Sequence, residues 1–168
     1  MRTFKSIVLV FAFIAAFVFT ASAQVPIALL DDAMAAVKAQ KGKVVVLAVG
    51  ASWLPLSDRQ AEYVIALAKK YAGKNVVFSF VVTDSTDAKS KNFASDDAVR
   101  KFVTANKLTM PILRDSNGVV VRKNLKVDQV PTFVIIDKDG NQSGEAFGGI
   151  DPKFDITVPI SKKIDSLL

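Results

Sequence analysis

The pattern that most constrains the fold is an apolar run, a helical segment and a second apolar run in close succession. Residues 44–49 read VVVLAV and residues 76–82 read VVFSFVV, so neither run alternates between apolar and polar side chains. Strands of this kind are typical of a parallel sheet covered by helices on both faces. Between the two runs, Ala61, Val64 and Tyr71 follow helical spacing. The sequence therefore predicts a β–α–β unit with a parallel strand pair and a right-handed crossover.

The other elements are predicted from the same periodicities and from turn residues. Ser57 or Asp58 is expected to cap the helix that follows the first apolar run, and Ser95 to cap a later one. Residues 119–125 are ambiguous, because their β-branched side chains favour a strand. The remaining expectations are helices over 30–40, 95–106 and 156–168, a short strand or extended link over 110–113, and a strand over 132–136 with a turn at 137–140 and an antiparallel partner over 142–147.

Residues 1–23 have the organisation of a cleavable signal peptide. Arg2 and Lys5 precede an apolar stretch, and Ala21-Ser22-Ala23 forms an A-x-A cleavage signal before Gln24. The apolar stretch is short compared with the roughly 20 residues that span a bilayer, so membrane attachment is expected only if the signal stays uncleaved. We expect a mature domain of residues 24–168 in the periplasm or outside the cell.

Two residue types are absent from the chain, and their absence excludes most kinds of catalytic chemistry. The 168 residues contain no Cys and no His. Without Cys there are no disulfides, no thiol chemistry and no thiolate metal sites. Without His the usual general base and the commonest transition-metal ligand are missing. Asp137 and Asp139 begin like a calcium loop, but no Glu closes it, so neither a metal nor another cofactor is expected.

The charge of the chain gives no support for nucleic-acid binding. The net charge is +6, and loss of Arg2 and Lys5 with the signal peptide lowers it to +4. The lysines are scattered, with no basic run and little aromatic interleaving. Arg59 and Arg114 could bind an anion, although single arginines are usually solvated.

Two separated motifs resemble the thioredoxin superfamily, in particular its secreted TlpA-like and redoxin branch. They are GASWLPLS at 50–57 and VPTFVIIDKDG at 130–140. The resemblance implies a thioredoxin-like α/β fold, a three-layer α/β/α sandwich whose mixed central sheet ends in a C-terminal antiparallel hairpin. It also implies a short helix, not a strand, over 119–125.

The same resemblance places a degenerate active site in the first motif. The family sequence runs Ala-Ser/Thr-Trp-Cys-Pro-Pro-Cys, so Leu54 and Ser57 stand where the two cysteines would be. The buried acid of many thioredoxins corresponds to Ala48. The matching proline of the family is cis, which implies that Val130-Pro131 packs against Trp53 and Leu54, where relatives pair with an extended substrate chain.

From these observations we expect the protein to have a binding or structural role and no catalytic residue. The expected partner-binding surface consists of Trp53, Leu54, Pro55, Leu56, Ser57, Val130 and Pro131. Its partner would be an extended polypeptide or a thioredoxin-like paralogue. Two alternatives remain: a thiol-disulfide oxidoreductase by kinship only, or a non-catalytic subunit that supports an active paralogue. Leu54 could also simply fill space that a lost function has left.

Overall fold

Strand β2 (Val44–Gly50) lies in the middle of a six-stranded sheet, and every residue of it is buried. The computed structural model describes residues 26–30, 34, 37–151 and 153–168. On one side β2 pairs in parallel with β3 (Val76–Val82), and on the other it pairs antiparallel with β5 (Thr132–Ile136). The predicted β–α–β unit is therefore confirmed.

The strand order is β1-β4-β3-β2-β5-β6. The first four strands are parallel, and the last two join antiparallel, which makes the sheet mixed. The other elements are β1 (Ile27–Leu29), α2 (Pro55–Lys70), α3 (Asp96–Ala105), β4 (Ile112–Arg114), the π-helix η1 (Val120–Asn124), β6 (Phe147–Gly148) and α4 (Thr157–Asp165).

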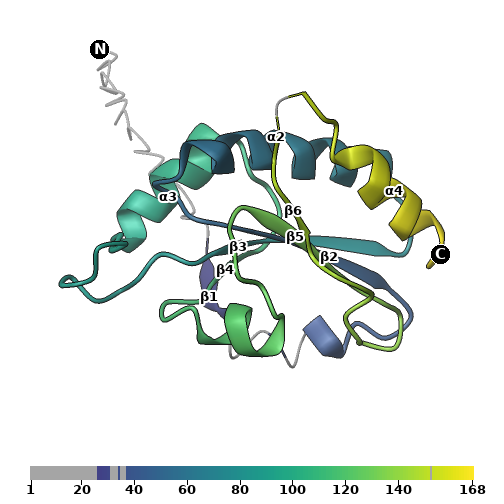
Figure 1. The fold of residues 1–168 in the computed structure, drawn as a ribbon, viewed down its shortest axis with the longest axis horizontal. Helices are drawn as coiled ribbons and strands as arrows, with labels where there is room; N and C mark the ends of the chain where they lie inside the picture. Colours follow the sequence, from purple (N-terminus) through teal and green to yellow (C-terminus); the bar gives the residue numbers. More distant parts are fainter. Residues whose placement is uncertain (1–25, 31–33, 35–36, 152) are drawn as a thin grey trace, which may run out of the picture.

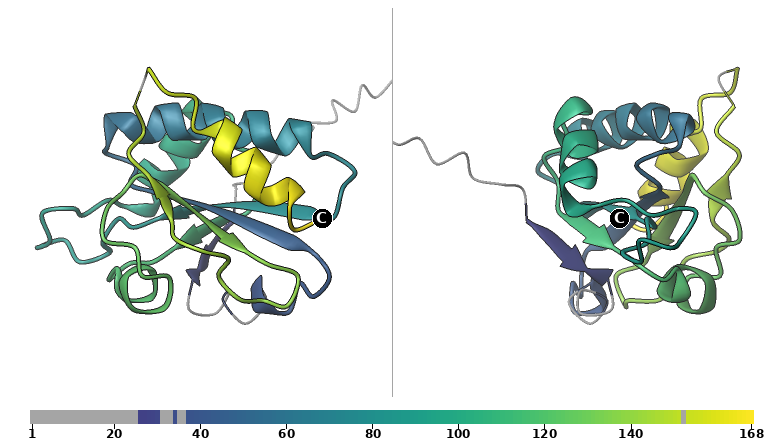
Figure 2. Two further views of the ribbon diagram at one scale, coloured as in Figure 1. Left: turned by 45° about the vertical axis from the view of Figure 1, so that its right-hand side comes forward. Right: turned by 90° about the vertical axis from the view of Figure 1, so that its left-hand side faces the viewer.

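Helices cover both faces of this sheet. Helices α2, α3 and α4 lie on one face, and η1 lies on the other (Figures 1 and 2). Alternate residues of β2 follow this division: Val46 and Ala48 pack in the core under α2 and α4, whereas Leu47 and Val49 pack in the second core with η1. A strand buried on both faces needs apolar side chains at every position, which explains why residues 44–49 do not alternate.

Several boundaries differ from the sequence-based expectations. Residues 119–125 contain the helix η1, so the strand prediction that their β-branched side chains favoured is wrong. The antiparallel partner of β5 is only Phe147–Gly148, with an isolated bridge at Gln142, because a loop replaces the expected strand over 142–147. In α4, Ile160 and Ile164 are buried as expected. The side chain of Leu168 is exposed, because it lies beyond the end of that helix.

Part of the N-terminal region lies outside the described residues, including the predicted signal peptide at 1–23 and most of the helix expected over 30–40. Leu30, Met34 and Val37 are described, and all three are buried in the second core. Within the part of the chain that the structure describes, no helix combines the length and the apolar character needed to cross a bilayer.

The side chain of Tyr71 links α2 to α4. It is 1% exposed, and its hydroxyl donates to the backbone oxygen of Ser161 at 3.0 Å and bonds a carboxylate oxygen of Asp165 at 2.9 Å. Burial, together with the hydrogen bond to Asp165 and its charge, raises the pKa of Tyr71 above its usual 10.0, against the opposing effect of the Ser161 side-chain hydroxyl.

The raised pKa of Tyr71 predicts a loss of stability in alkali. Folded protein keeps this proton at pH values where the unfolded chain releases it, so the contribution is complete below about pH 10 and is lost as the pH rises beyond that. Urea unfolding between pH 9 and pH 11 should show a steeper fall in the free energy of unfolding for wild type than for Tyr71→Phe. Parallel curves for the two proteins would contradict this account.

Candidate functional site

The loop between β2 and α2 runs from Ala51 to Leu54 and enters the helix through Pro55. Leu54 is the N-cap and offers no side-chain acceptor, while Pro55 occupies the first helical position, where its missing N–H costs nothing. The expectation that Ser57 or Asp58 caps this helix is therefore wrong. Ser57 lies in the first turn and is fully buried, and its Oγ accepts from the backbone N–H of Ala51 at 3.1 Å.

Gln60 joins this helix to the two strands beneath it. Its side chain is fully buried, and Nε2 donates to the backbone oxygen of Thr132 at 2.6 Å and to that of Val49 at 3.2 Å. Val49 lies opposite Thr132, the last pair of the antiparallel ladder. Gln60 therefore holds both halves of the predicted site, the loop after β2 and the segment before β5, against each other.

The Val130-Pro131 peptide bond is cis, as the resemblance implied. Pro131 is buried and Val130 is half-buried. Val130 lines a pocket of about 400 Å³ together with polar residues that include Ser85, Asn92 and Asp128. The backbone N–H and C=O of Val130 take part in none of the hydrogen bonds among the described residues.

Apolar side chains remain exposed at the front of the loop. Trp53 is 55% exposed and Leu56 is 43% exposed, and Leu54 between them is half-buried. Trp53 lines a groove of about 600 Å³ that lies against α3. Trp53 and Val130 therefore line different cavities, and the expected packing of Val130-Pro131 against Trp53 and Leu54 stays a prediction.

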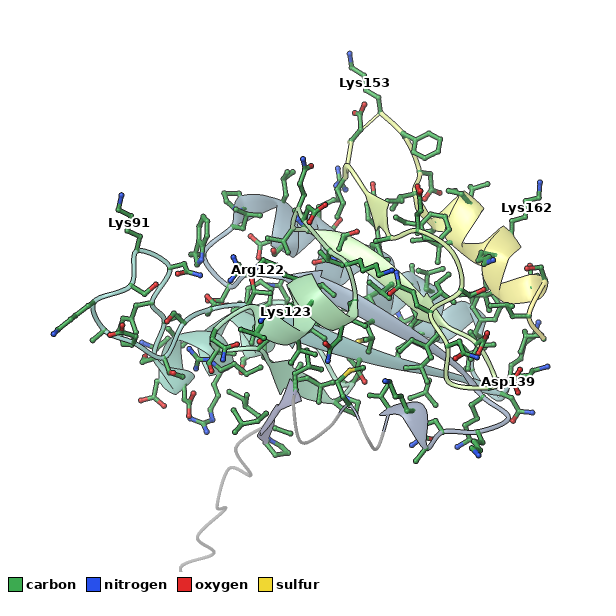
Figure 3. The ribbon with its side chains drawn as sticks, turned by 60° about the horizontal axis from the view of Figure 1, so that its bottom comes forward. Lys91, Arg122, Lys123, Asp139, Lys153 and Lys162 are labelled. Carbon is green, nitrogen blue, oxygen red and sulfur yellow. The ribbon has the colours of Figure 1, made fainter. Side chains whose placement is uncertain are left out.

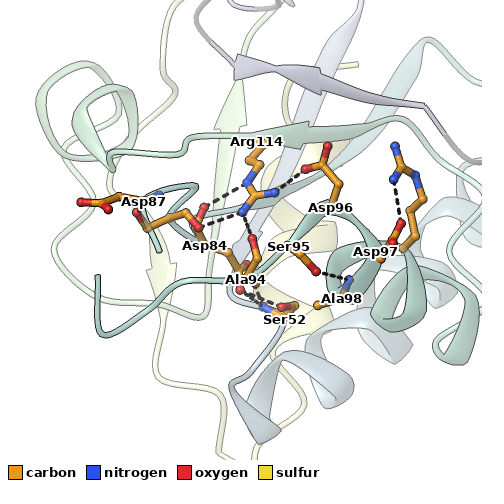
Figure 4. A network of polar contacts seen from close by, with 11 residues as sticks. Ser52, Asp84, Asp87, Ala94, Ser95, Asp96, Asp97, Ala98 and Arg114 are labelled. Atoms are coloured by element: carbon orange, nitrogen blue, oxygen red, sulfur yellow. Dashed lines mark hydrogen bonds and ion pairs between the residues drawn. The ribbon is translucent and has the colours of Figure 1, made fainter. Parts of the chain in front are cut away.

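A buried polar network fixes the backbone of this loop (Figure 4). Asp84, which follows β3 and is fully buried, accepts from the Ser52 N–H at 2.9 Å and from the Ser52 Oγ at 2.7 Å. Arg114, which is 2% exposed, donates through Nε to the backbone oxygen of Asp84 at 3.1 Å. Its other donors reach the backbone oxygens of Ser85 and Ala94 and the carboxylate of Asp96.

This network holds one buried guanidinium against three backbone oxygens and one carboxylate. Removing such a group leaves several buried acceptors without donors, each at a cost of about 1–3 kcal/mol. The expectation that Arg114 is solvated is therefore wrong, whereas Arg59 is exposed and pairs with Glu62. The polar segment after β3 is tied to the candidate site, although the sequence offered no sign of this link.

The residues at this site offer few chemical possibilities. Thiol exchange needs cysteine, and the chain has none. A serine nucleophile needs a neighbouring base, and the Ser57 hydroxyl contacts the Ala51 N–H instead. Among the described residues, no three Asp or Glu side chains are grouped so that they could hold a metal ion. What the site presents is apolar surface and unpaired backbone.

Comparison with known proteins agrees with this architecture. Residues 7–141 match the model of the AhpC/TSA family, so the chain belongs to the AhpC/TSA family. No curated protein sequence matches it significantly.

Solved structures of the thioredoxin-like type are similar to this chain. One is a Chlorobium tepidum protein named thiol:disulfide interchange protein DsbE (21% identity, TM-score 0.64, 77% of this chain and 82% of that one). Another is a secreted Mycobacterium tuberculosis disulfide oxidoreductase homologous to Escherichia coli DsbE (22% identity, TM-score 0.57, 77% and 85%). A third is a thioredoxin family protein of Chlorobium tepidum (16% identity, TM-score 0.59, 77% and 82%). These similarities establish the thioredoxin-like fold.

The close approach of Gly50 to α2 generates a prediction. A Cβ added at Gly50 would lie 2.5 Å from Gln60 Oε1 and 2.7 Å from Ser57 Oγ, closer than van der Waals contact allows. Gly50→Ala should therefore lower the free energy of unfolding by about 1–3 kcal/mol, the usual cost of overpacking a core. Chemical denaturation measures this.

Gly148→Ala is the matched control, because Gly148 is also a strand residue without positive φ and the nearest atom to its added Cβ is 3.6 Å away. It should change stability by less than about 0.5 kcal/mol, as surface substitutions usually do. Equal effects of the two substitutions would show that the contact between Gly50 and Gln60 is not tight.

Proposed function

We propose that this protein is an exported, redox-inactive member of its family that binds extended polypeptide at the surface formed by residues 53–56 and Val130, hereafter the docking surface. Ser57 and Pro131, which the sequence placed on this surface, are buried beneath it. The observation that carries the proposal is that Trp53 on the loop and Leu56 at the start of α2 are exposed, in a segment that contains neither Cys nor His. Leu54 and Ser57 are proposed to stand at the two cysteine positions of active relatives.

Chemistry argues against catalysis at these positions. In a dithiol exchanger, a thiolate at the helix N-terminus attacks and a second cysteine resolves the mixed disulfide. Leu54 has no ionisable atom, and the Ser57 hydroxyl is buried against the loop backbone. Insulin reduction by the purified protein should not rise above the buffer blank.

The free energy of binding at the docking surface depends on more than apolar contact. Burying about 300 Å² of apolar surface contributes roughly 7.5 kcal/mol, which the association cost of about 4–15 kcal/mol largely offsets. The exposed apolar side chains alone would therefore bind weakly. The free backbone groups of Val130 could add main-chain hydrogen bonds of the kind that fix an extended peptide along a sheet edge.

A charged substitution at Leu56 tests the docking surface. Leu56→Asp should weaken binding to an unfolded model polypeptide, reduced carboxymethylated α-lactalbumin, by at least about tenfold, because a carboxylate would have to be desolvated in the interface. Binding is measured by fluorescence anisotropy. Leu56 is the second residue of α2, where Asp is compatible with the helix dipole, so folding should be preserved.

Val158→Asp is the matched control. Val158 is the second residue of α4, is 64% exposed and does not line the groove at Trp53. It should bind like wild type. Equal affinities for wild type and Leu56→Asp, or equal losses in both variants, would contradict the proposed docking surface.

We propose export because residues 1–23 have the organisation of a cleavable signal peptide. The similarity to a secreted Mycobacterium tuberculosis protein supports this proposal. Expression in a bacterial host with a functional secretion system should give a mature chain that begins at Gln24. N-terminal sequencing and intact mass measure this. A chain that retains residues 1–23 in the membrane fraction would instead indicate an uncleaved anchor.

A further inference from the structure

Lysines that are scattered along the sequence gather at one end of the folded chain. The four segments 38–43, 69–75, 137–143 and 162–168, hereafter the lysine end, contain nine lysines, three aspartates and no other charged side chain. Their side chains therefore carry a net charge of +6. The rest of residues 24–168, with 11 basic and 13 acidic side chains, carries −2. The positive charge of the mature domain is thus concentrated in these segments.

Hydrogen bonds hold the four segments together. The backbone N–H of Gly42 donates to the backbone oxygen of Lys138 at 2.9 Å, and the first N–H of β2 donates to the backbone oxygen of Asn75 at 2.9 Å. The hydroxyl of Tyr71 bonds the carboxylate of Asp165 at 2.9 Å. Figures 1 and 2 show the same grouping, at the end of the molecule where the chain terminates.

The charges of the lysine end face solvent. Seven of its lysines are exposed and the other two are half-buried. None of the nine forms an ion pair with a described acidic side chain. The Nζ atoms of Lys70 and Lys74 each lie 5.4 Å from the centre of the Tyr71 ring, so one buried ring positions two of the charges. The lysine end is therefore a positive surface with little local compensation.

The lysine end lies opposite the docking surface. Strand β2 begins directly after Lys43 and leads at its other end into the loop at 51–54, and α2 begins at Pro55 and ends at Lys70. The seven residues of β2 separate the two ends by about 20 Å. In Figure 3, Lys162 and Asp139 lie at one end of the molecule and Lys91 lies at the other. A partner bound to the lysine end would leave the docking surface free.

The side chains at this end favour a diffuse anionic surface over a nucleic acid. The four segments contain no arginine, and their only aromatic residue, Tyr71, is 1% exposed. Proteins that bind single-stranded nucleic acid stack bases on exposed aromatic side chains, and arginine is the usual residue for bidentate phosphate recognition. Lysines act as hydrated point charges, and several of them together are attracted to a bilayer that carries anionic headgroups.

We propose that the lysine end binds the surface of an anionic phospholipid bilayer and holds the docking surface facing away from it. The contact is electrostatic and peripheral, since Leu168 is the only large apolar side chain exposed in these segments. It does not depend on residues 1–23. It is also independent of polypeptide binding, because no residue of the docking surface takes part.

Cosedimentation of the purified mature protein with lipid vesicles tests the proposal. Vesicles of equal parts phosphatidylglycerol and phosphatidylcholine should bind the protein at least about tenfold more tightly than vesicles of phosphatidylcholine alone. Binding at about 50 mM NaCl should be lost at about 500 mM NaCl, because salt screens exposed charges.

Removing three charges from the lysine end should weaken this binding. The triple variant Lys41→Gln, Lys69→Gln and Lys162→Gln changes exposed lysines from three of the four segments. Because each lysine near an anionic surface adds to the attraction, the variant should bind the anionic vesicles at least about tenfold more weakly. Thermal unfolding should confirm that the variant is folded.

A second triple variant with the same net charge is the matched control. It carries Lys89→Gln, Lys91→Gln and Lys123→Gln, which are also exposed and form no ion pair among the described residues. Lys91 lies at the opposite end of the molecule and Lys123 near its middle (Figure 3). This variant should bind the anionic vesicles like wild type.

The single tryptophan reports the orientation on the bilayer. Trp53 is 55% exposed on the docking surface, so its emission should not shift when the protein binds anionic vesicles. A blue shift would show that the docking surface meets the lipid instead, and would overturn the proposal. Leu56→Asp should bind vesicles like wild type, so this inference and the proposed polypeptide binding can fail separately.

Three further results would overturn the proposal. The first is equal binding to anionic and zwitterionic vesicles, or binding to neither at the lower salt concentration. The second is an equal loss in both triple variants, since net charge alone would then explain it. The third is binding of a single-stranded oligonucleotide, weakened in the first triple variant, without any binding of vesicles. The occupant would then be a nucleic acid, and the lipid assignment would be wrong.

Discussion

The candidate site depends on a single buried carboxamide. Gln60 reaches from α2 to the backbone oxygens of Val49 and Thr132, so one side chain joins the end of the central strand to the residue after the cis proline. Gly50 makes this possible, because any side chain there would occupy the space of Gln60 and Ser57. The apolar surface in front of this contact can remain exposed because the polar contact behind it fixes the backbone.

A second buried group, Arg114, fixes the other side of the site in a similar way. It gathers the backbone oxygens of Asp84, Ser85 and Ala94, and Asp84 in turn holds the loop at Ser52. Neither network contains a thiol or an imidazole. The scaffold therefore holds the loop after β2 in a fixed conformation, while the chain contains no thiol and no imidazole.

The sequence predicted the centre of this fold well and its polar interior poorly. The continuous apolar runs at 44–49 and 76–82 are typical of strands covered on both faces. The structure confirms that both runs form such strands. Gln60, Asp84 and Arg114 gave no comparable signal, because polar residues are mostly exposed and local periodicity does not reveal long-range partners. Ser57 was misjudged for a related reason: a hydroxyl near a helix start usually caps it, but here Pro55 begins the helix earlier. The helix η1 shows that tertiary packing of Val120 and Val121 overrides their strand propensity.

The account's central claim is that a loop without reactive atoms still recognises polypeptide. Titration of isotopically labelled protein with reduced carboxymethylated α-lactalbumin, followed by backbone amide NMR, tests this most directly. Chemical-shift changes should be confined to residues 52–57 and 129–131. Changes spread over α4 and the β5–β6 loop instead, or no changes at a saturating concentration of this polypeptide, would contradict the claim.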